Sequence, residues 1–383
     1  MTHLPALFWR SFFPARDGAY RRLSGQRLLV MALFWPLFLL LLAGNRLCLW
    51  LDTVIFPDFK SVPVERPLFV AGIPRSGTTF LHRLLAGDQQ RFTTMTLWEV
   101  VFAPSIIQRR FWLGVAALDQ RLGAPLAALL HWLERKALGG LDGVHKTGLG
   151  EAEEDYLALA NYLGCFLLIL PFGDTRLWQL AYLDRDAPAA EKQRLMRHYR
   201  ALVQRHLYVH GSERTFLSKN PSFTPWLHSL AETFPGARFI ACMRTPLEAV
   251  PSQISSILIG ARLFSSKPDE RWWREGLSSM LVHYYEQVLA LEQEWSATHY
   301  QIVRMAHLAA DPASTVIQLY QQFALPLTAD YQCWLDEQTV KARQYQSGHH
   351  YQSSTLGIDE QELREQFAFA IAASEDAPSD QSN

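Results

Sequence analysis

The sequence lacks an excess of charge of either sign. Its 383 residues include 36 lysines and arginines against 37 aspartates and glutamates, so the formal net charge is −1. Without a general positive field the chain has no long-range attraction for polyanionic nucleic acid, so we expect no nucleic-acid partner and only local anion sites. The 49% hydrophobic content excludes a disordered chain and predicts a globular protein with a sizeable core.

The sequence is also poor in cysteine. Cys48, Cys165, Cys242 and Cys333 lie far apart and lack the C-x-x-C spacing of metal and redox motifs. This distribution excludes a disulfide-rich scaffold and predicts free thiols. The one candidate glycosylation sequon, at 220–222, contains the forbidden proline. Both absences favour a reducing, cytoplasmic compartment.

Internal repeats are absent as well, which excludes solenoid and propeller folds. The low-complexity polar tail at 374–383 is expected to be disordered. We therefore expect an apolar, membrane-associated segment at 1–60, one α/β domain at 61–373 and this tail. Within the domain, residues from about 110–212 are rich in aromatics, show no clear strand and predict a large helical insertion.

Residues 28–44 form an uncharged apolar run that follows several arginines. Its length is at the short limit for a bilayer span, and the preceding positive charge would keep the N-terminus cytoplasmic. Pro36 interrupts the run, and Asn45, Arg46 and Asp52 follow it closely. These features favour a helix that lies in the membrane interface, with its arginines at anionic headgroups, over a helix that spans the bilayer.

The location that we expect is therefore the cytoplasmic face of a membrane, with peripheral or monotopic attachment. A single-pass membrane protein and a buried core helix stay as alternatives. A cleaved signal peptide is disfavoured because the apolar run begins late and lacks a small-residue cleavage site.

Short β-rich segments alternate with helical ones along the rest of the chain. Residues 67–72, 214–219, 237–244 and 299–305 have the composition of buried strands, and each precedes a segment with helical spacing. Such alternation predicts an α/β fold with a P-loop-like parallel sheet flanked by helices.

A glycine-rich loop joins the first of these strands to its helix. In such a position backbone N–H groups and the helix dipole converge on an anion. The spacing is that of a phosphate-binding P-loop, G-x-x-x-x-G, but Thr78 replaces the lysine that follows the second glycine in ATP- and GTP-binding proteins. Instead, the planar guanidinium of Arg75 places several N–H donors inside the loop. The loop reads Gly72-Ile73-Pro74-Arg75-Ser76-Gly77-Thr78-Thr79.

The loop PRSGTT at 74–79 resembles the 5'-phosphosulfate loop of sulfotransferases that use 3'-phosphoadenosine 5'-phosphosulfate (PAPS). The segment ACMRTPLEAVPSQISS at 241–256 resembles the 3'-phosphate motif of the same superfamily, in which a strand-end arginine and a serine eight residues later hold the phosphate. Arg244 and Ser252 have this spacing. The resemblance therefore implies PAPS as co-substrate, bound by Pro74, Arg75, Ser76, Gly77, Thr78, Thr79, Arg244 and Ser252.

Two further segments are similar to the family. Lys219, in the segment Lys219-Asn220-Pro221, resembles the K-x-P lysine that lies beside the sulfuryl group in tyrosylprotein sulfotransferases. The segment at 347–358 looks like the nucleotide-proximal loop of the bacterial branch, with His350 and Tyr351 as contacts. These matches imply transfer of a sulfuryl group to a hydroxyl of a lipid, glycan or other small molecule.

The reaction needs in-line geometry and a base for the acceptor hydroxyl. Glu99, in TLWEVVFAP, resembles the catalytic glutamate of tyrosylprotein sulfotransferases and is our first candidate. His145 is its rival, because a neutral imidazole suits proton abstraction near neutral pH. The plain structural alternatives are an ion-paired carboxylate for Glu99 and a polar loop residue for His145. Nothing in the sequence requires a metal.

Two other functions stay open at this point. One is a P-loop kinase or NTPase, which the missing lysine disfavours. The other is a catalytically inactive, membrane-associated nucleotide-binding protein.

Overall fold

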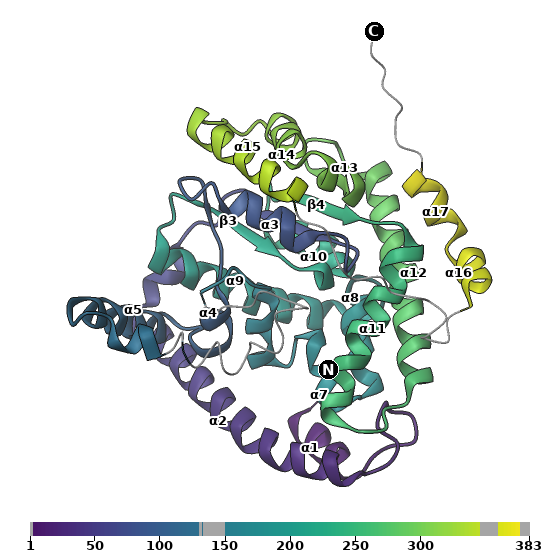
Figure 1. Cartoon of the computed structure of the whole chain (residues 1–383). Helices are drawn as coiled ribbons and strands as arrows, with labels where there is room; N and C mark the ends of the chain where they lie inside the picture. Colours follow the sequence, from purple (N-terminus) through teal and green to yellow (C-terminus); the bar gives the residue numbers. More distant parts are fainter. Residues whose placement is uncertain (1–2, 130–131, 133–149, 345–358, 376–383) are drawn as a thin grey trace.

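A five-stranded parallel sheet forms the centre of the molecule (Figure 1). The computed structural model describes residues 3–129, 132, 150–344 and 359–375. The strand order is β2-β3-β1-β4-β5. The strands are β1 Leu68–Gly72, β2 Phe92–Thr93, β3 Thr215–Lys219, β4 Arg238–Met243 and β5 Tyr300–Arg304.

The α/β fold with a parallel sheet is confirmed. The predicted strands at 67–72, 214–219, 237–244 and 299–305 each occur, shortened by one or two residues. The sequence does not predict β2, because two residues show no period. β1 is buried at every position, as expected for a central strand covered on both faces.

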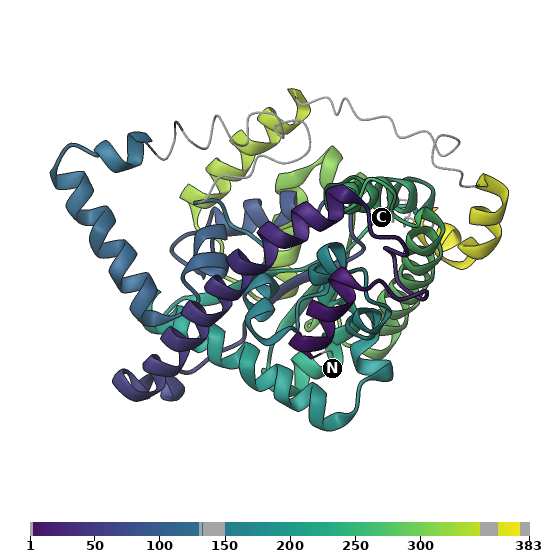
Figure 2. The same ribbon diagram turned by 90° about the horizontal axis from the view of Figure 1, so that it is seen from below.

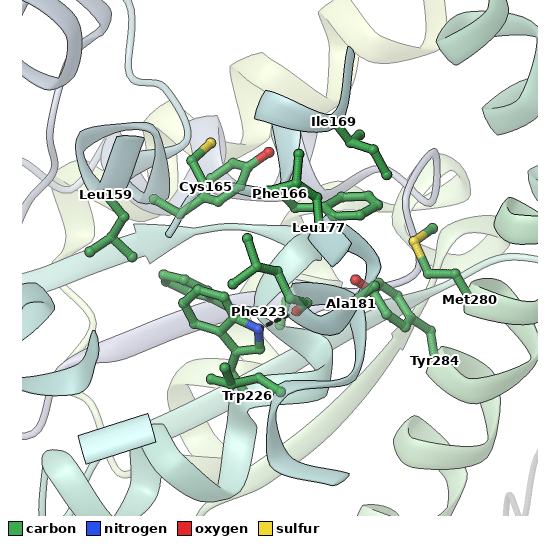
Figure 3. Packing of buried hydrophobic residues seen from close by; sticks show 14 of the residues in the cluster. Leu159, Cys165, Phe166, Ile169, Leu177, Ala181, Phe223, Trp226, Met280 and Tyr284 are labelled. Atoms are coloured by element: carbon green, nitrogen blue, oxygen red, sulfur yellow. Dashed lines mark hydrogen bonds between the residues drawn. The ribbon is translucent and has the colours of Figure 1, made fainter. Parts of the chain in front are cut away.

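Helices cover both faces of the sheet, and side chains that alternate along β1 divide the core in two. Phe69 and Ala71 join the larger cluster, whereas Leu68 and Val70 join the smaller one. Figure 3 shows part of the larger cluster, where the Trp226 indole is buried and donates a hydrogen bond of 2.7 Å to the Leu180 carbonyl. The result is a three-layer sandwich with the sheet in the middle.

The remaining elements follow the strands in order. Before β1 lie α1 Leu4–Phe12, α2 Gly25–Ile55 and η1 Pro57–Ser61, and α3 Thr78–Ala86 follows β1. Between β2 and β3 lie α4 Leu97–Phe102, α5 Ile106–Arg121, η2 Asp155–Tyr162, η3 Phe166–Leu168, α7 Ile169–Phe172, η4 Thr175–Tyr182, α8 Leu183–Asp186 and α9 Ala189–His210. The last group is η5 Pro221–Trp226, α10 Leu227–Thr233, α11 Pro246–Phe264, α12 Glu270–Glu294, α13 Met305–Ala310, α14 Pro312–Gln322, α15 Ala329–Gln344, α16 Glu360–Gln366 and α17 Ala368–Glu375.

The apolar N-terminal run is part of a helix longer than the run itself. α2 has 31 residues and contains Pro36, and it is the one helix in the described part of the chain that is long and apolar enough to cross a membrane. Figure 2 shows it lying across the underside of the molecule, with α1 close by. One face packs on the body through Met31, Trp35, Leu42 and Leu49, whose spacing of four, seven and seven residues forms a helical stripe.

Polar anchors hold α2 to the body as well. The Asp52 carboxylate is fully buried, accepts a hydrogen bond of 2.9 Å from the backbone N–H of Ile106 and pairs with Arg205 Nε at 2.9 Å. The Asn45 amide donates to the Val101 carbonyl at 3.0 Å. Asp52 thus accepts a hydrogen bond from the first N–H of α5 and also neutralises the charge of the buried Arg205.

Replacement of Asp52 by alanine should lower the free energy of unfolding by about 3–5 kcal/mol, because it leaves Arg205 buried without a counter-charge. Urea denaturation measures this difference. Glu275→Ala is the control, since it breaks an exposed pair with Arg271 and should change stability by about 0.5 kcal/mol or less. Equal effects of the two substitutions would contradict the buried anchor.

Candidate active site

The loop between β1 and α3 is held by unusual backbone geometry. Gly77 has φ of 84°, and a Cβ built on it would lie 2.2 Å from the Met305 sulfur, so glycine is required there. Arg75 also has a positive φ, of 67°. The Ser76 hydroxyl donates to the Cys242 carbonyl at 2.9 Å, which ties the loop to β4. The first backbone N–H groups of α3 therefore face a loop of fixed shape.

The loop and the predicted 3'-phosphate motif meet in the structure. Arg75 Nε donates to the Ser252 hydroxyl at 3.1 Å, and Ser252, on α11, is buried. Arg244 follows the last residue of β4 and pairs with Glu248 at 2.6 Å, and about a third of its side chain is exposed. An arginine, a serine and the loop thus line one edge of the sheet, where an anion with two charged groups would find donors from both sides.

Pro74, Ser76 and Thr78 are buried in the loop, and Thr79 is partly exposed. The structure brings these residues together with Arg75, Gly77 and Ser252 at the carboxyl ends of β1 and β4.

Lys219 ends β3, next to β1. It lies opposite Val70 in the sheet, and only 2% of its side chain is exposed. Its ammonium lies 3.4 Å from a Glu153 carboxylate oxygen and 3.2 Å from a Glu154 oxygen. Burial raises the pKa of Glu154, an effect that Lys219 opposes and Glu153 reinforces. A lysine and two carboxylates therefore share one site at the edge that carries the loop.

Asp155 fixes the backbone beside this cluster. Its carboxylate accepts hydrogen bonds from Ser218 at 2.8 Å and from Tyr199 and Asn220. Burial raises its pKa to about 6, against the opposing effect of these donors. Since Ser218 and Asn220 flank Lys219, Asp155 holds the lysine segment in place.

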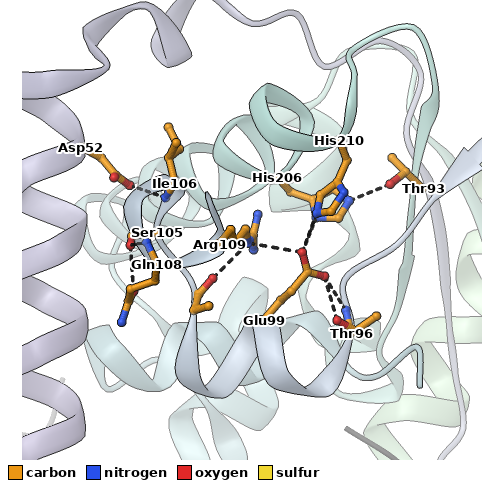
Figure 4. Close-up of polar contacts among 11 residues, drawn as sticks. Asp52, Thr93, Thr96, Glu99, Ser105, Ile106, Gln108, Arg109, His206 and His210 are labelled. Atoms are coloured by element: carbon orange, nitrogen blue, oxygen red, sulfur yellow. Dashed lines mark hydrogen bonds and ion pairs between the residues drawn. The ribbon is translucent and has the colours of Figure 1, made fainter. Parts of the chain in front are cut away.

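Glu99 lies in a buried network of hydrogen bonds and ion pairs that Figure 4 shows. One carboxylate oxygen receives hydrogen bonds from the Thr96 N–H and hydroxyl at 2.9 Å, as in a capping box at the start of α4. The other lies 2.6 Å from His210 Nε2 and 3.5 Å from Arg109 Nε. Burial raises the pKa of Glu99, but Arg109 and the histidines outweigh it and hold this pKa well below its usual range.

The same network has the ligand set of a metal site. Glu99, His206 and His210 each offer one donor atom, and these atoms lie within 4.8 Å of one another. The Arg109 guanidinium already neutralises the carboxylate, and its charge would repel a divalent cation. The network therefore favours an ion pair over a bound metal.

Three predicted residues, His145, His350 and Tyr351, lie outside the described residues. The predictions for them stay predictions. Sequence reasoning did not give Glu153 and Glu154 a place beside Lys219, although three consecutive acids in an apolar region are a usable signal.

A glycine loop joins a central parallel strand to its helix, with Thr78 where NTP-binding loops carry lysine and with Arg75 inside the loop. This arrangement points to a class of α/β group-transfer proteins. The chain belongs to the sulfotransferase family, whose model matches residues 67–330. It is therefore a sulfotransferase, and the kinase or NTPase alternative is not supported.

Curated relatives agree with this assignment. The omega-hydroxy-beta-dihydromenaquinone-9 sulfotransferase Stf3 of Mycobacterium bovis is 25% identical over 295 residues, which cover 76% of this chain and 69% of the relative. The protein of the same name from Mycobacterium tuberculosis matches equally.

Two solved structures share the fold. Sulfotransferase STF1 of Mycobacterium tuberculosis has a TM-score of 0.63 and 20% identity, covering 95% of this chain and 90% of that one. Sulfotransferase STF9 of Mycobacterium avium has a TM-score of 0.68 and 18% identity, covering 98% of this chain and 97% of that one.

His82, on α3, should make stability depend on pH. Burial, together with the charges of Lys219 and Arg83, lowers its pKa to about 3. In the unfolded chain His82 has an ordinary pKa near 6.5, so between about pH 6.5 and 3 it binds a proton that it does not bind in the folded chain. The contribution of His82 to stability is therefore complete above about pH 6.5 and falls as the pH drops toward 3.

His82→Gln, which keeps a polar partner for the Thr94 hydroxyl, should remove this loss. Between pH 6 and 4 the slope of unfolding free energy against pH should become shallower by up to about 1.4 kcal/mol per pH unit. Urea denaturation over this range measures it. Parallel slopes for the two proteins would show that His82 is protonated in the folded chain.

Proposed function

We propose that this sulfotransferase uses PAPS as its donor and transfers the sulfuryl group to a hydroxyl of a membrane-borne lipid. The observation that carries the donor assignment is the 3.1 Å hydrogen bond between Arg75 and Ser252. It joins a loop of 5'-phosphosulfate type to a serine with the spacing of a 3'-phosphate motif, so one nucleotide with phosphates at both ends would satisfy both.

In this proposal the N–H groups at the start of α3, together with the hydroxyls of Thr78 and Thr79, hold the phosphosulfate. Arg75 offsets charge on the leaving oxygen. Arg244 exchanges its contact with Glu248 for the 3'-phosphate. Donors of this kind stabilise developing charge without a metal.

Lys219 is proposed to act beside the sulfuryl group. Its ammonium is buried at the edge that carries the loop, where it would balance negative charge on the transferred group. The two glutamates that now pair with it would be released when the donor arrives.

Two carboxylates, Glu99 and Glu154, are our candidates for the base that removes the proton of the acceptor hydroxyl. Glu99 stays a prediction from resemblance, but both of its oxygens are bonded and its pKa is depressed, which makes it a weak proton acceptor. Glu154 is favoured by the geometry, because its pKa is raised, its side chain is 23% exposed and it contacts Lys219.

Exposed apolar side chains support a membrane-borne acceptor. On α1 and α2 they include Phe8, Trp9, Leu29, Leu33, Leu37, Leu40, Leu47, Trp50 and Val54. These side chains gather on two helices rather than being scattered singly over the surface, which fits a helix that lies in the membrane interface. The relative Stf3 is named for a hydroxyl on a menaquinone lipid, which is an acceptor of this kind.

If α2 spanned the membrane, as in the single-pass alternative, it would lose its polar contacts with the body. A span would have to remove Asp52 from Arg205 and Asn45 from Val101, leaving buried polar groups without partners. We therefore propose monotopic attachment to the cytoplasmic face.

Arg244→Ala should weaken binding of adenosine 3',5'-bisphosphate by about 10- to 100-fold, since a charge-assisted contact contributes about 1.5–3 kcal/mol. Isothermal titration calorimetry measures the change. Arg271→Ala is a matched control, because Arg271 forms the same type of pair with a glutamate four residues later. Unchanged affinity in Arg244→Ala would remove the 3'-phosphate assignment.

Glu154→Gln should slow single-turnover sulfuryl transfer from radiolabelled PAPS by about 100-fold or more, the scale for loss of a general base, with nucleotide affinity nearly intact. Glu99→Gln should mainly lower stability. The opposite ranking of the two rates would assign the base to Glu99, and no transfer by the unaltered protein would identify a catalytically inactive member of the family.

A further inference from the structure

A cavity of about 710 Å3 lies between α2, η1, η2 and α9, away from the loop and the Lys219 cluster. Within the described part of the chain, its lining contains five cationic side chains and no acidic one. These cations are Arg46 on α2, Lys60 in η1, and Arg197, Arg200 and Arg205 on α9. A chain with a net charge of −1 therefore concentrates positive charge in one hollow.

Most of this charge is uncompensated. Arg205 pairs with Asp52. As far as the structure describes the chain, Arg46 donates only to the Asn161 carbonyl, at 2.7 Å, and Arg200 only to the Thr233 carbonyl, at 3.3 Å. Neutral carbonyls leave the charge in place. Among the described residues, the remaining cations of the cavity, Arg197 and Lys60, form no ion pair either. The cavity is therefore built for an anion.

His198 reports the electrostatic potential in the cavity. Its ring stacks on Tyr162, with the ring centroids 3.8 Å apart. Burial lowers its pKa to about 4, and Arg194, Arg197, Arg205 and Arg46 lower it in the same direction. An anion bound here would offset these arginines and raise the pKa of His198.

The position of the cavity indicates which anion it receives. Its α2 wall consists of Arg46, Leu49, Trp50 and Thr53, at spacings of three, four and seven residues. Trp50 is 59% exposed and also belongs to the apolar surface of α2, so the cavity opens at the border of that surface. Cations and a tryptophan beside an apolar helix face are placed at the depth of lipid headgroups.

We propose that this cavity binds the phosphate headgroup of an anionic phospholipid of the membrane. The arginines of α9 and Arg46 contact the phosphate, while the acyl chains lie along the exposed leucines of α2. The bound lipid sets the rotation of the protein on the membrane surface, and with it the direction in which the active site faces. This inference rests on the membrane location in the proposed function.

The test compares Arg197→Ala/Arg200→Ala with Lys341→Ala/Arg364→Ala. The first pair is exposed on α9, and the second removes the same charge from α15 and α16, which lie far from α2 in Figure 1. Cosedimentation with vesicles of phosphatidylcholine, with and without phosphatidylglycerol, measures binding. The first variant should lose about 10- to 30-fold in affinity for the anionic vesicles, at about 1 kcal/mol per cation, and the second much less.

A second measurement separates a site from general surface charge. NMR of the His198 ring is followed during titration with short-chain phosphatidylglycerol below its micelle concentration. We expect its pKa to rise, and short-chain phosphatidylcholine and inorganic phosphate to leave it unchanged. Equal losses for the two double variants, an unmoved His198 or an equal effect of inorganic phosphate would overturn the proposal.

Failure of the proposed function gives other results. Arg197→Ala/Arg200→Ala should transfer the sulfuryl group from PAPS to a soluble alcohol at the unaltered rate, since these residues lie outside the active site. If the unaltered protein binds neither kind of vesicle, the membrane location fails together with the lipid site. If it binds both kinds equally, only the lipid site fails.

Discussion

The close contact between the ends of β1 and β4 is the constraint on which the site depends. Gly72 ends β1 with φ of 109°, and a Cβ at that position would lie 2.2 Å from the Cys242 carbonyl oxygen of β4. Because nothing larger than glycine fits, the chain leaves the sheet at a fixed angle, and Ser76 returns to the same carbonyl at 2.9 Å. The position of Arg75 relative to Ser252 follows from these two contacts.

Local signals made much of this predictable. The strands have a continuous apolar composition, so the sheet follows from the sequence. The spacing of the loop glycines predicts the loop between β1 and α3 at which we propose the anion binds. The surroundings of Glu99 do not follow from it, because His210 lies 111 residues further along the chain and no local pattern pairs them. The neighbours of Lys219 escaped prediction for the same reason, since Glu154 reaches it across 65 residues.

Charge in this protein is balanced locally rather than globally. Buried cations such as Arg109 and Arg205 each have a carboxylate within reach, so the core contains ion pairs whose rupture would be costly. At the border of α2 the balance is absent, and the uncompensated arginines line a hollow at the surface. The overall charge of the sequence hides both features, which explains why composition excluded a general positive field and yet revealed neither the core pairs nor the hollow.

The two faces of α2 impose different rules on sequence variation. Positions on the packed stripe, such as Met31 and Trp35, must keep a side chain of the same size and shape, because they pack against the body. Asn45 and Asp52 must keep their polar groups, because each has a defined partner in the body. Positions on the opposite face need only remain apolar. Among homologous chains, substitutions in this helix should therefore recur with the period of an α-helix, a pattern that a simple transmembrane span, surrounded by lipid on all sides, would not produce.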